Sequence, residues 1–119
     1  MSTEDRLLGP GYYAVALQTT IDGVNGCADR EAAFDLIHKS VDRLAGEISS
    51  SKKFIGPDVR LVVLPEYFLT AYPVGESIEG WADKACLDMS GPEYDMLGKI
   101  AQDNDLYLSG NAYEKDPNF

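Results

Sequence analysis

The fold class is decided by residues 61–73, Leu61-Val62-Val63-Leu64-Pro65-Glu66-Tyr67-Phe68-Leu69-Thr70-Ala71-Tyr72-Pro73. Four consecutive apolar residues predict a strand buried on both faces, as in a parallel sheet. Pro65 lacks a backbone N–H and ends that strand. Glu66 then stands at the strand's carboxyl end, where open α/β sheets bind ligands. A carboxylate held among aromatic and aliphatic groups is costly to keep charged, so Glu66 is a candidate general base.

Two further strands and a long helix surround this stretch. The apolar residues 12–20 and 106–113 predict a first and a third strand, the first of them buried. Asp29 is expected to cap a helix, and the segment 49–53 is expected to fray its end. The spacings of three and four along that helix define an apolar stripe made of Phe34, Ile37, Val41, Leu44 and Ile48.

A second helix is predicted after a segment without clear periodicity. Residues 74–89 are expected to form an irregular loop that walls a pocket, with Trp81 as a lid or as an anchor of the loop. Ser90 is a predicted helix cap, with Pro92 in the first turn and Glu93 three residues after the cap. Residues 1–11 are expected to be a loose lead-in.

The order strand, helix, strand, helix, strand predicts an α/β fold. Helices that cover one face of an apolar sheet leave its other face to be covered by further chain or by a partner. One domain is expected from 119 residues.

The composition argues against several classes of partner. Ten Lys and Arg against twenty Asp and Glu give a net charge of −10, which disfavours nucleic acid and anionic membrane surfaces. The sequence shows no secretory signal and no apolar run of membrane-spanning length. Cys27 and Cys86 are therefore expected to be reduced thiols of a cytoplasmic protein, although a bridge between them stays open.

Metal and nucleotide sites are not predicted. One histidine, His38, and two distant cysteines do not give the spacing of a zinc site, so His38 is expected to be an ordinary helix residue. The loop at residues 23–26 contains two glycines but matches neither the dinucleotide fingerprint nor the phosphate-binding loop.

Taken in order, these parts resemble the N-terminal part of the nitrilase superfamily, the carbon–nitrogen hydrolases. The resemblance covers residues 12–113, and its most specific piece is Pro65-Glu66 followed by aromatic residues and Ala71-Tyr72-Pro73. It implies a four-layer α-β-β-α sandwich that assembles into homo-oligomers. It also implies a metal-free and cofactor-free enzyme that hydrolyses a non-peptide amide, nitrile or carbamoyl bond of a small molecule through a Glu-Lys-Cys triad.

The resemblance assigns one catalytic residue in this chain. Glu66 matches the family's general base, whereas the lysine and the nucleophilic cysteine have no matching position, and Lys115 stands too early for the lysine. By their places in the sequence, Tyr67 and Tyr72 are candidates to line a substrate pocket, with a core position as the alternative. Asn111 is a third candidate pocket residue, one that would orient Glu66 or the lysine.

Two other functions stay open. The domain is expected to be incomplete at residue 119, so these residues alone are predicted to be inactive. A non-catalytic α/β binding or assembly module is the alternative, because the lysine and cysteine are missing and one sheet face needs a cover. A flavodoxin-like domain is a third possibility.

Overall fold

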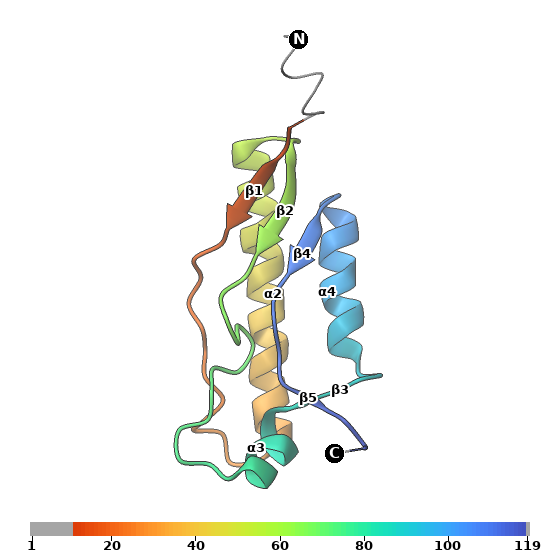
Figure 1. The fold of residues 1–119 in the computed structure, drawn as a ribbon. Helices are drawn as coiled ribbons and strands as arrows, with labels where there is room; N and C mark the ends of the chain where they lie inside the picture. The colour runs from red at the N-terminus through yellow and green to blue at the C-terminus, as the bar shows by residue number, and fades with distance from the viewer. Residues whose placement is uncertain (1–10, 119) are drawn as a thin grey trace.

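Three helices and two small parallel sheets make up residues 11–118, the part of the chain that the computed structural model describes (Figure 1). The larger sheet has the order β1-β2-β4, and the smaller one pairs β3 with β5. The strands are β1 (Tyr13–Ala16), β2 (Val59–Val63), β3 (Leu87–Asp88), β4 (Tyr107–Ser109) and β5 (Glu114–Lys115). The predicted α/β class with a parallel sheet is confirmed, while the lead-in expected at residues 1–11 lies, except for Gly11, outside the described residues.

The longest helix, α2 (Arg30–Ile55), forms the back of the structure. Asp29 caps it as predicted, because its side chain accepts a 2.9 Å hydrogen bond from the backbone N–H of Ala32. The expected fraying from residue 49 is wrong, and the helix continues to Ile55. Its last turns are held by Lys52, whose ammonium donates to the carbonyls of Val59 at 2.8 Å and Asp105 at 3.0 Å.

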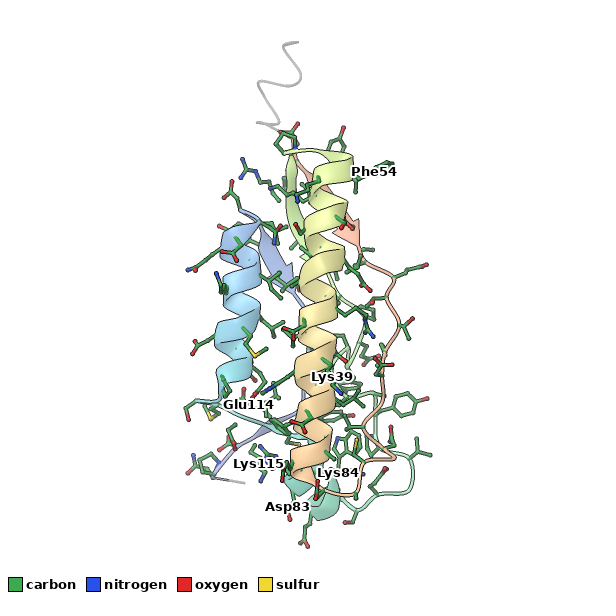
Figure 2. The ribbon with its side chains drawn as sticks, turned by 180° about the vertical axis from the view of Figure 1, so that it is seen from behind. Lys39, Phe54, Asp83, Lys84, Glu114 and Lys115 are labelled. Atoms are coloured by element: carbon green, nitrogen blue, oxygen red, sulfur yellow. The ribbon has the colours of Figure 1, made fainter. Side chains whose placement is uncertain are left out.

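Helices α2 and α4 (Pro92–Asp103) cover the same face of the larger sheet (Figures 1 and 2). The strands are in register, so one row of side chains, from Val15, Val62 and Leu108, packs into the core beneath the helices. The adjacent rows belong to the opposite face, because side chains alternate along a strand. On that face Val63 is 40% exposed and Tyr107 is 79% exposed.

The open face corrects one prediction and confirms another. Burial of β2 on both faces is wrong for this chain, and β1, also expected to be buried, is largely exposed. The expectation that the helices leave the second face of the sheet without a cover is confirmed for residues 11–118. The face carries two in-register rows, formed by Ala14, Leu61 and Tyr107 and by Ala16, Val63 and Ser109.

Residues 74–89 are more regular than expected. They contain helix α3 (Ile78–Ala85), which begins where the Ser77 hydroxyl accepts a 3.0 Å hydrogen bond from the N–H of Gly80. Trp81 lies on this helix and is 3% exposed, so it anchors the segment. Eight residues are too few for an apolar periodicity to be recognised in the sequence. The serine at position 77, a common helix cap, was the one sequence feature that could have indicated the start of α3.

The predicted cap of α4 at Ser90 is wrong. The helix begins after Gly91, which makes no side-chain cap hydrogen bond, and Pro92 occupies the first turn as expected. Glu93 is 2% exposed and does not close a capping box. Its carboxylate lies 2.7 Å from Nε2 of His38 on α2, so this buried acid ties the start of α4 to the long helix.

The first and third strands are shorter than predicted. Hydrogen-bonded pairing covers Tyr13–Ala16 in the first and Tyr107–Ser109 in the third, after which the chain crosses to β5. Among the residues described, no helix combines the length and the apolar character needed to cross a membrane.

Candidate functional site

A strained turn follows β2 and carries Glu66 at its start. Tyr67 has a φ of 51° and Ala71 a φ of 61°, both in the left-handed region that non-glycine residues avoid. The N–H groups of Thr70 and Ala71 donate to the Tyr67 carbonyl at 3.2 and 2.9 Å, which closes the turn on itself. Such backbone conformations cost about 1–3 kcal/mol each, so surrounding contacts must hold them.

The end of β4 supplies the first of these contacts. The side-chain oxygen of Asn111 accepts a 2.8 Å hydrogen bond from the Tyr67 N–H. Beside it, a Cβ on Gly110 would lie 2.7 Å from Cε1 of Phe68 and 3.1 Å from Cδ1, so any larger residue at this position would have to displace the Phe68 ring. Phe68 is buried in the core. Asn111 therefore holds the backbone of the turn through the Tyr67 N–H, and Gly110 leaves room for the Phe68 ring of the same turn.

The loop after β1 supplies the second contact. The N–H of Val24 donates to the Thr70 carbonyl at 3.0 Å, and the amide of Asn25 donates to the Tyr72 carbonyl at 2.9 Å. A Cβ on Gly23 would lie 3.3 Å from that of Ala71, so the two loops pack closely. The carboxyl ends of β1, β2 and β4 thus converge on the turn that carries Glu66, which is the edge where α/β sheets bind ligands.

Glu66 itself is exposed, so the expected enclosure by aromatic and aliphatic groups is wrong for this chain. Pro65 and Glu66 lie beyond the last paired residue of β2, and the apolar side chains of the turn point away from the acid into the core, as the burial of Phe68 and Leu69 shows. Its charge nevertheless acts on one neighbour, Tyr113, described next.

Three aromatic rings connect this turn to α3. Tyr67 stacks on Tyr113 with ring centroids 4.3 Å apart and planes 12° apart, and Trp81 meets Tyr113 edge-on at 5.8 Å. The pKa of Tyr113 lies above its ordinary value, first because its hydroxyl is desolvated, and then because of its hydrogen bond with Tyr67 and the nearby negative charges, among them Glu66. Glu66 and the aromatic rings therefore belong to one neighbourhood.

A cavity of about 1140 Å³ adjoins these rings. Tyr113 and Trp81 line it, together with α3 residues, the β3–α4 connection and the segment around β5. Neither Tyr67 nor Tyr72, the predicted pocket residues, is part of its lining, and the side chain of Tyr72 is exposed. Asn111 instead lines a smaller cavity of about 360 Å³ beside Phe68 and α4.

The two cysteines and two nearby lysines do not form a catalytic group with Glu66 in the part of the chain that the structure describes. Both cysteines are free, so the bridge that the sequence left open is not formed. Cys86 is buried, and its desolvation raises the pKa of the thiol, which disfavours the reactive thiolate. The ammonium of Lys84 donates to the carbonyls of Asn25 and Cys27, and Lys115 pairs with Asp83 at 3.6 Å (Figure 2).

Comparisons of the sequence with protein families and with curated proteins identified no relative of this chain. No known family description matches the chain. No curated protein is significantly similar to it in sequence. Within residues 11–118, no three His, Cys, Asp or Glu side chains gather as a metal-binding group.

Proposed function

We propose that this chain contributes the general base Glu66 to a carbon–nitrogen hydrolase of the nitrilase type. The observation that most supports this proposal is the turn at residues 66–71. Two non-glycine residues of this turn have positive φ, and the segments that follow β1 and β4 hold it in place. Strained backbone is concentrated at functional sites. The sequence of this turn is also the most specific part of the family resemblance.

In the proposed reaction, a cysteine and a lysine come from chain outside residues 1–119. Glu66 accepts the proton of the cysteine thiol, and the thiolate forms a C–S bond to the carbonyl or nitrile carbon of a small molecule. The lysine stabilises the negative charge that develops on the substrate. With an amide, Glu66 passes this proton to the leaving nitrogen, and the C–N bond breaks to leave an acyl-thioester; with a nitrile, a water molecule first adds to the carbon of the thioimidate, and ammonia then leaves. Glu66 next takes a proton from a hydrolytic water molecule, whose oxygen attacks the acyl carbon. The C–S bond breaks, the acid is released, and the proton returns from Glu66 to the cysteine sulfur.

The two exposed features of the chain support the same proposal. The open face of the larger sheet would pack on a second sheet to give the four-layer α-β-β-α sandwich, and the apolar side chains Val63 and Tyr107 suit such an interface. Chain that brings the lysine and cysteine to the carboxyl edge would also enclose Glu66. Assembly into homo-oligomers is part of the proposal.

The test is the substitution Glu66→Gln in the full-length protein, assayed by ammonia release from a panel of small amides, nitriles and carbamoyl compounds. We expect turnover to fall by about 10²-fold or more, because a positioned base contributes 10²–10⁴-fold. Far-ultraviolet circular dichroism should be unchanged, since Glu66 is exposed. Asp42→Asn, an exposed acid in the middle of α2, is the matched control and should keep full activity. Retained turnover in Glu66→Gln would contradict the assignment.

A second candidate function is a non-catalytic module that associates through the open sheet face. The observation in its favour is the exposure of both Glu66 and the apolar side chains on that face. A full-length protein that turns over none of the panel and forms no acyl-cysteine by mass spectrometry would favour this module over the hydrolase.

A further inference from the structure

A polar cluster around Asn25 lies at the far end of the strained turn. The side-chain amide of Asn25 donates two hydrogen bonds, to the Tyr72 carbonyl at 2.9 Å and to the Glu76 carboxylate at 3.2 Å. The backbone carbonyl of Asn25 accepts from the ammonium of Lys84 on α3 at 2.9 Å (Figure 2). One asparagine therefore joins the residue that follows the turn to an acid and to a lysine of the next helix.

The charged members of this cluster are largely removed from solvent. The side chains of Lys84 and Glu76 are 15% and 20% exposed, and Nζ of Lys84 lies 4.0 Å from Oε1 of Glu76. The hydrogen bond from its own backbone N–H lowers the pKa of Glu76 most, and those from Val74 and the Asn25 amide lower it further. The positive charge of Lys84 adds to this effect, which outweighs the desolvation of the acid. Glu76 is therefore an ionised acceptor at neutral pH, and it fixes the direction of the Asn25 amide.

The cluster acts on the turn together with the two residues that precede Asn25. The N–H of Val24 donates to the Thr70 carbonyl at 3.0 Å. A Cβ on Gly23 would lie 3.3 Å from that of Ala71, whose φ is 61°. A non-glycine residue keeps such a conformation only where its surroundings hold it. Loss of the Asn25 contacts should therefore release this end of the turn.

We propose that Asn25 is a positioning residue for the carboxylate of Glu66. Glu76 holds the Asn25 amide in the orientation that this role requires. Asn111 holds the start of the turn, whereas Asn25 holds its end. The link to catalysis rests on the proposed function, because Glu66 acts as a base only in that reaction; the contact of Asn25 with the turn does not depend on it.

The first test is the substitution Asn25→Asp in the full-length protein, with kcat and KM measured on the panel of amides, nitriles and carbamoyl compounds. An oxygen would then take the place of the amide nitrogen, opposite the Tyr72 carbonyl and the Glu76 carboxylate. We expect kcat to fall by about tenfold to 10²-fold, because a displacement of about 1 Å can cost that much. KM should change little, since the variant loses no contact with substrate. An unchanged kcat would overturn the proposal.

A second substitution tests the part played by Glu76. Glu76→Gln in the Asn25→Asp protein places an amide opposite the new carboxylate, which restores a donor and an acceptor with their roles exchanged. It also removes the repulsion between two carboxylates. The double variant should regain at least about fivefold in kcat over Asn25→Asp, which corresponds to about 1 kcal/mol. A double variant that is no faster than Asn25→Asp would reject the role of Glu76.

Asn104→Ala is the matched control. The side-chain amide of Asn104 also donates to a backbone carbonyl, that of Ile100 at 2.8 Å, at the end of α4. Asn104 precedes β4 and so lies at the amino edge of the sheet, opposite the turn. This variant should be less stable in urea and keep its full kcat, which separates the loss of a hydrogen bond from the loss of position.

Amide hydrogen exchange distinguishes this proposal from the hydrolase. The N–H groups of Thr70 and Ala71 donate to the Tyr67 carbonyl, so their exchange reports the closure of the turn without any substrate. In Asn25→Asp both should exchange at least about fivefold faster relative to the amides of α2. Faster exchange in a protein that hydrolyses nothing would reject the hydrolase and retain the hold of Asn25 on the turn. Normal turnover with unchanged exchange would retain the hydrolase and reject the positioning role.

Discussion

Gly110→Ala offers the sharpest test of how the candidate site is held. The new methyl group would lie 2.7 Å from Cε1 and 3.1 Å from Cδ1 of Phe68, and 3.5 Å from the Cβ of Leu64. Contacts below 3.0 Å require a shift, and the Phe68 ring is 4% exposed within the core. Added methyl groups in a packed core cost about 1–3 kcal/mol, so the free energy of unfolding should fall by that amount.

The assay is urea unfolding of the full-length protein, followed by tryptophan fluorescence and circular dichroism. Gly98→Ala is the matched control, since Gly98 lies within α4 and a Cβ there meets no atom within 4 Å. That control should stabilise the protein by about 0.5–1 kcal/mol, because alanine favours a helix over glycine. A Gly110→Ala protein as stable as the wild type would refute the claim that Phe68 packs against the end of β4.

The remaining predictions concern polar contacts and pH. Asn111→Ala should lower the free energy of unfolding by about 0.5–1.5 kcal/mol, whereas Asn111→Asp, which keeps an acceptor for the Tyr67 N–H, should lose less; urea unfolding measures both. His38→Ala should destabilise the protein by about 1–3 kcal/mol because it leaves the buried Glu93 without this partner, while the double variant with Glu93→Gln should recover part of the loss. Burial, and then the hydrogen bond to Glu114, raises the pKa of Tyr94 from 10.0 to about 12. A raised pKa means that the folded state favours the protonated phenol, so the contribution of Tyr94 to the free energy of unfolding should be fully present below pH 10 and be lost between pH 10 and about 12. Tyr94→Phe should flatten this part of a plot of the free energy of unfolding against pH. An unchanged slope would contradict the contact between Tyr94 and Glu114.

The layout of the fold could be predicted from periodicity. The stripe from Phe34 to Ile48 and the cap at Asp29 predicted α2, and the apolar run before Pro65 predicted β2, because these signals extend over several turns or strand residues. Helix α3 was missed because eight residues around Trp81 are too few for a clear period. The exposure of β1 could not be predicted, since an apolar sequence does not say which face a neighbouring layer covers.

The candidate site was predictable in part. Proline after an apolar strand placed Glu66 at the sheet edge. Asn111, within the predicted third strand, was expected to orient Glu66 or the lysine, and its side chain instead accepts from the N–H of Tyr67, the residue after Glu66. The packing of Phe68 on Gly110 and the aromatic stack of Tyr67 on Tyr113 join residues more than 40 positions apart. Such contacts depend on backbone conformation, here the positive φ of Tyr67, which no local sequence pattern specified.

The different supports of the turn and of the cavity have a consequence for protein engineering. The turn is locked by a core ring, a glycine and a side-chain amide, so changes around Phe68 or Gly110 disturb stability and site geometry together. The lining of the cavity includes exposed side chains such as Ile78 and Met89, whose replacement costs the core little. A mutant library that reshapes this cavity should therefore vary these exposed residues and leave the turn untouched.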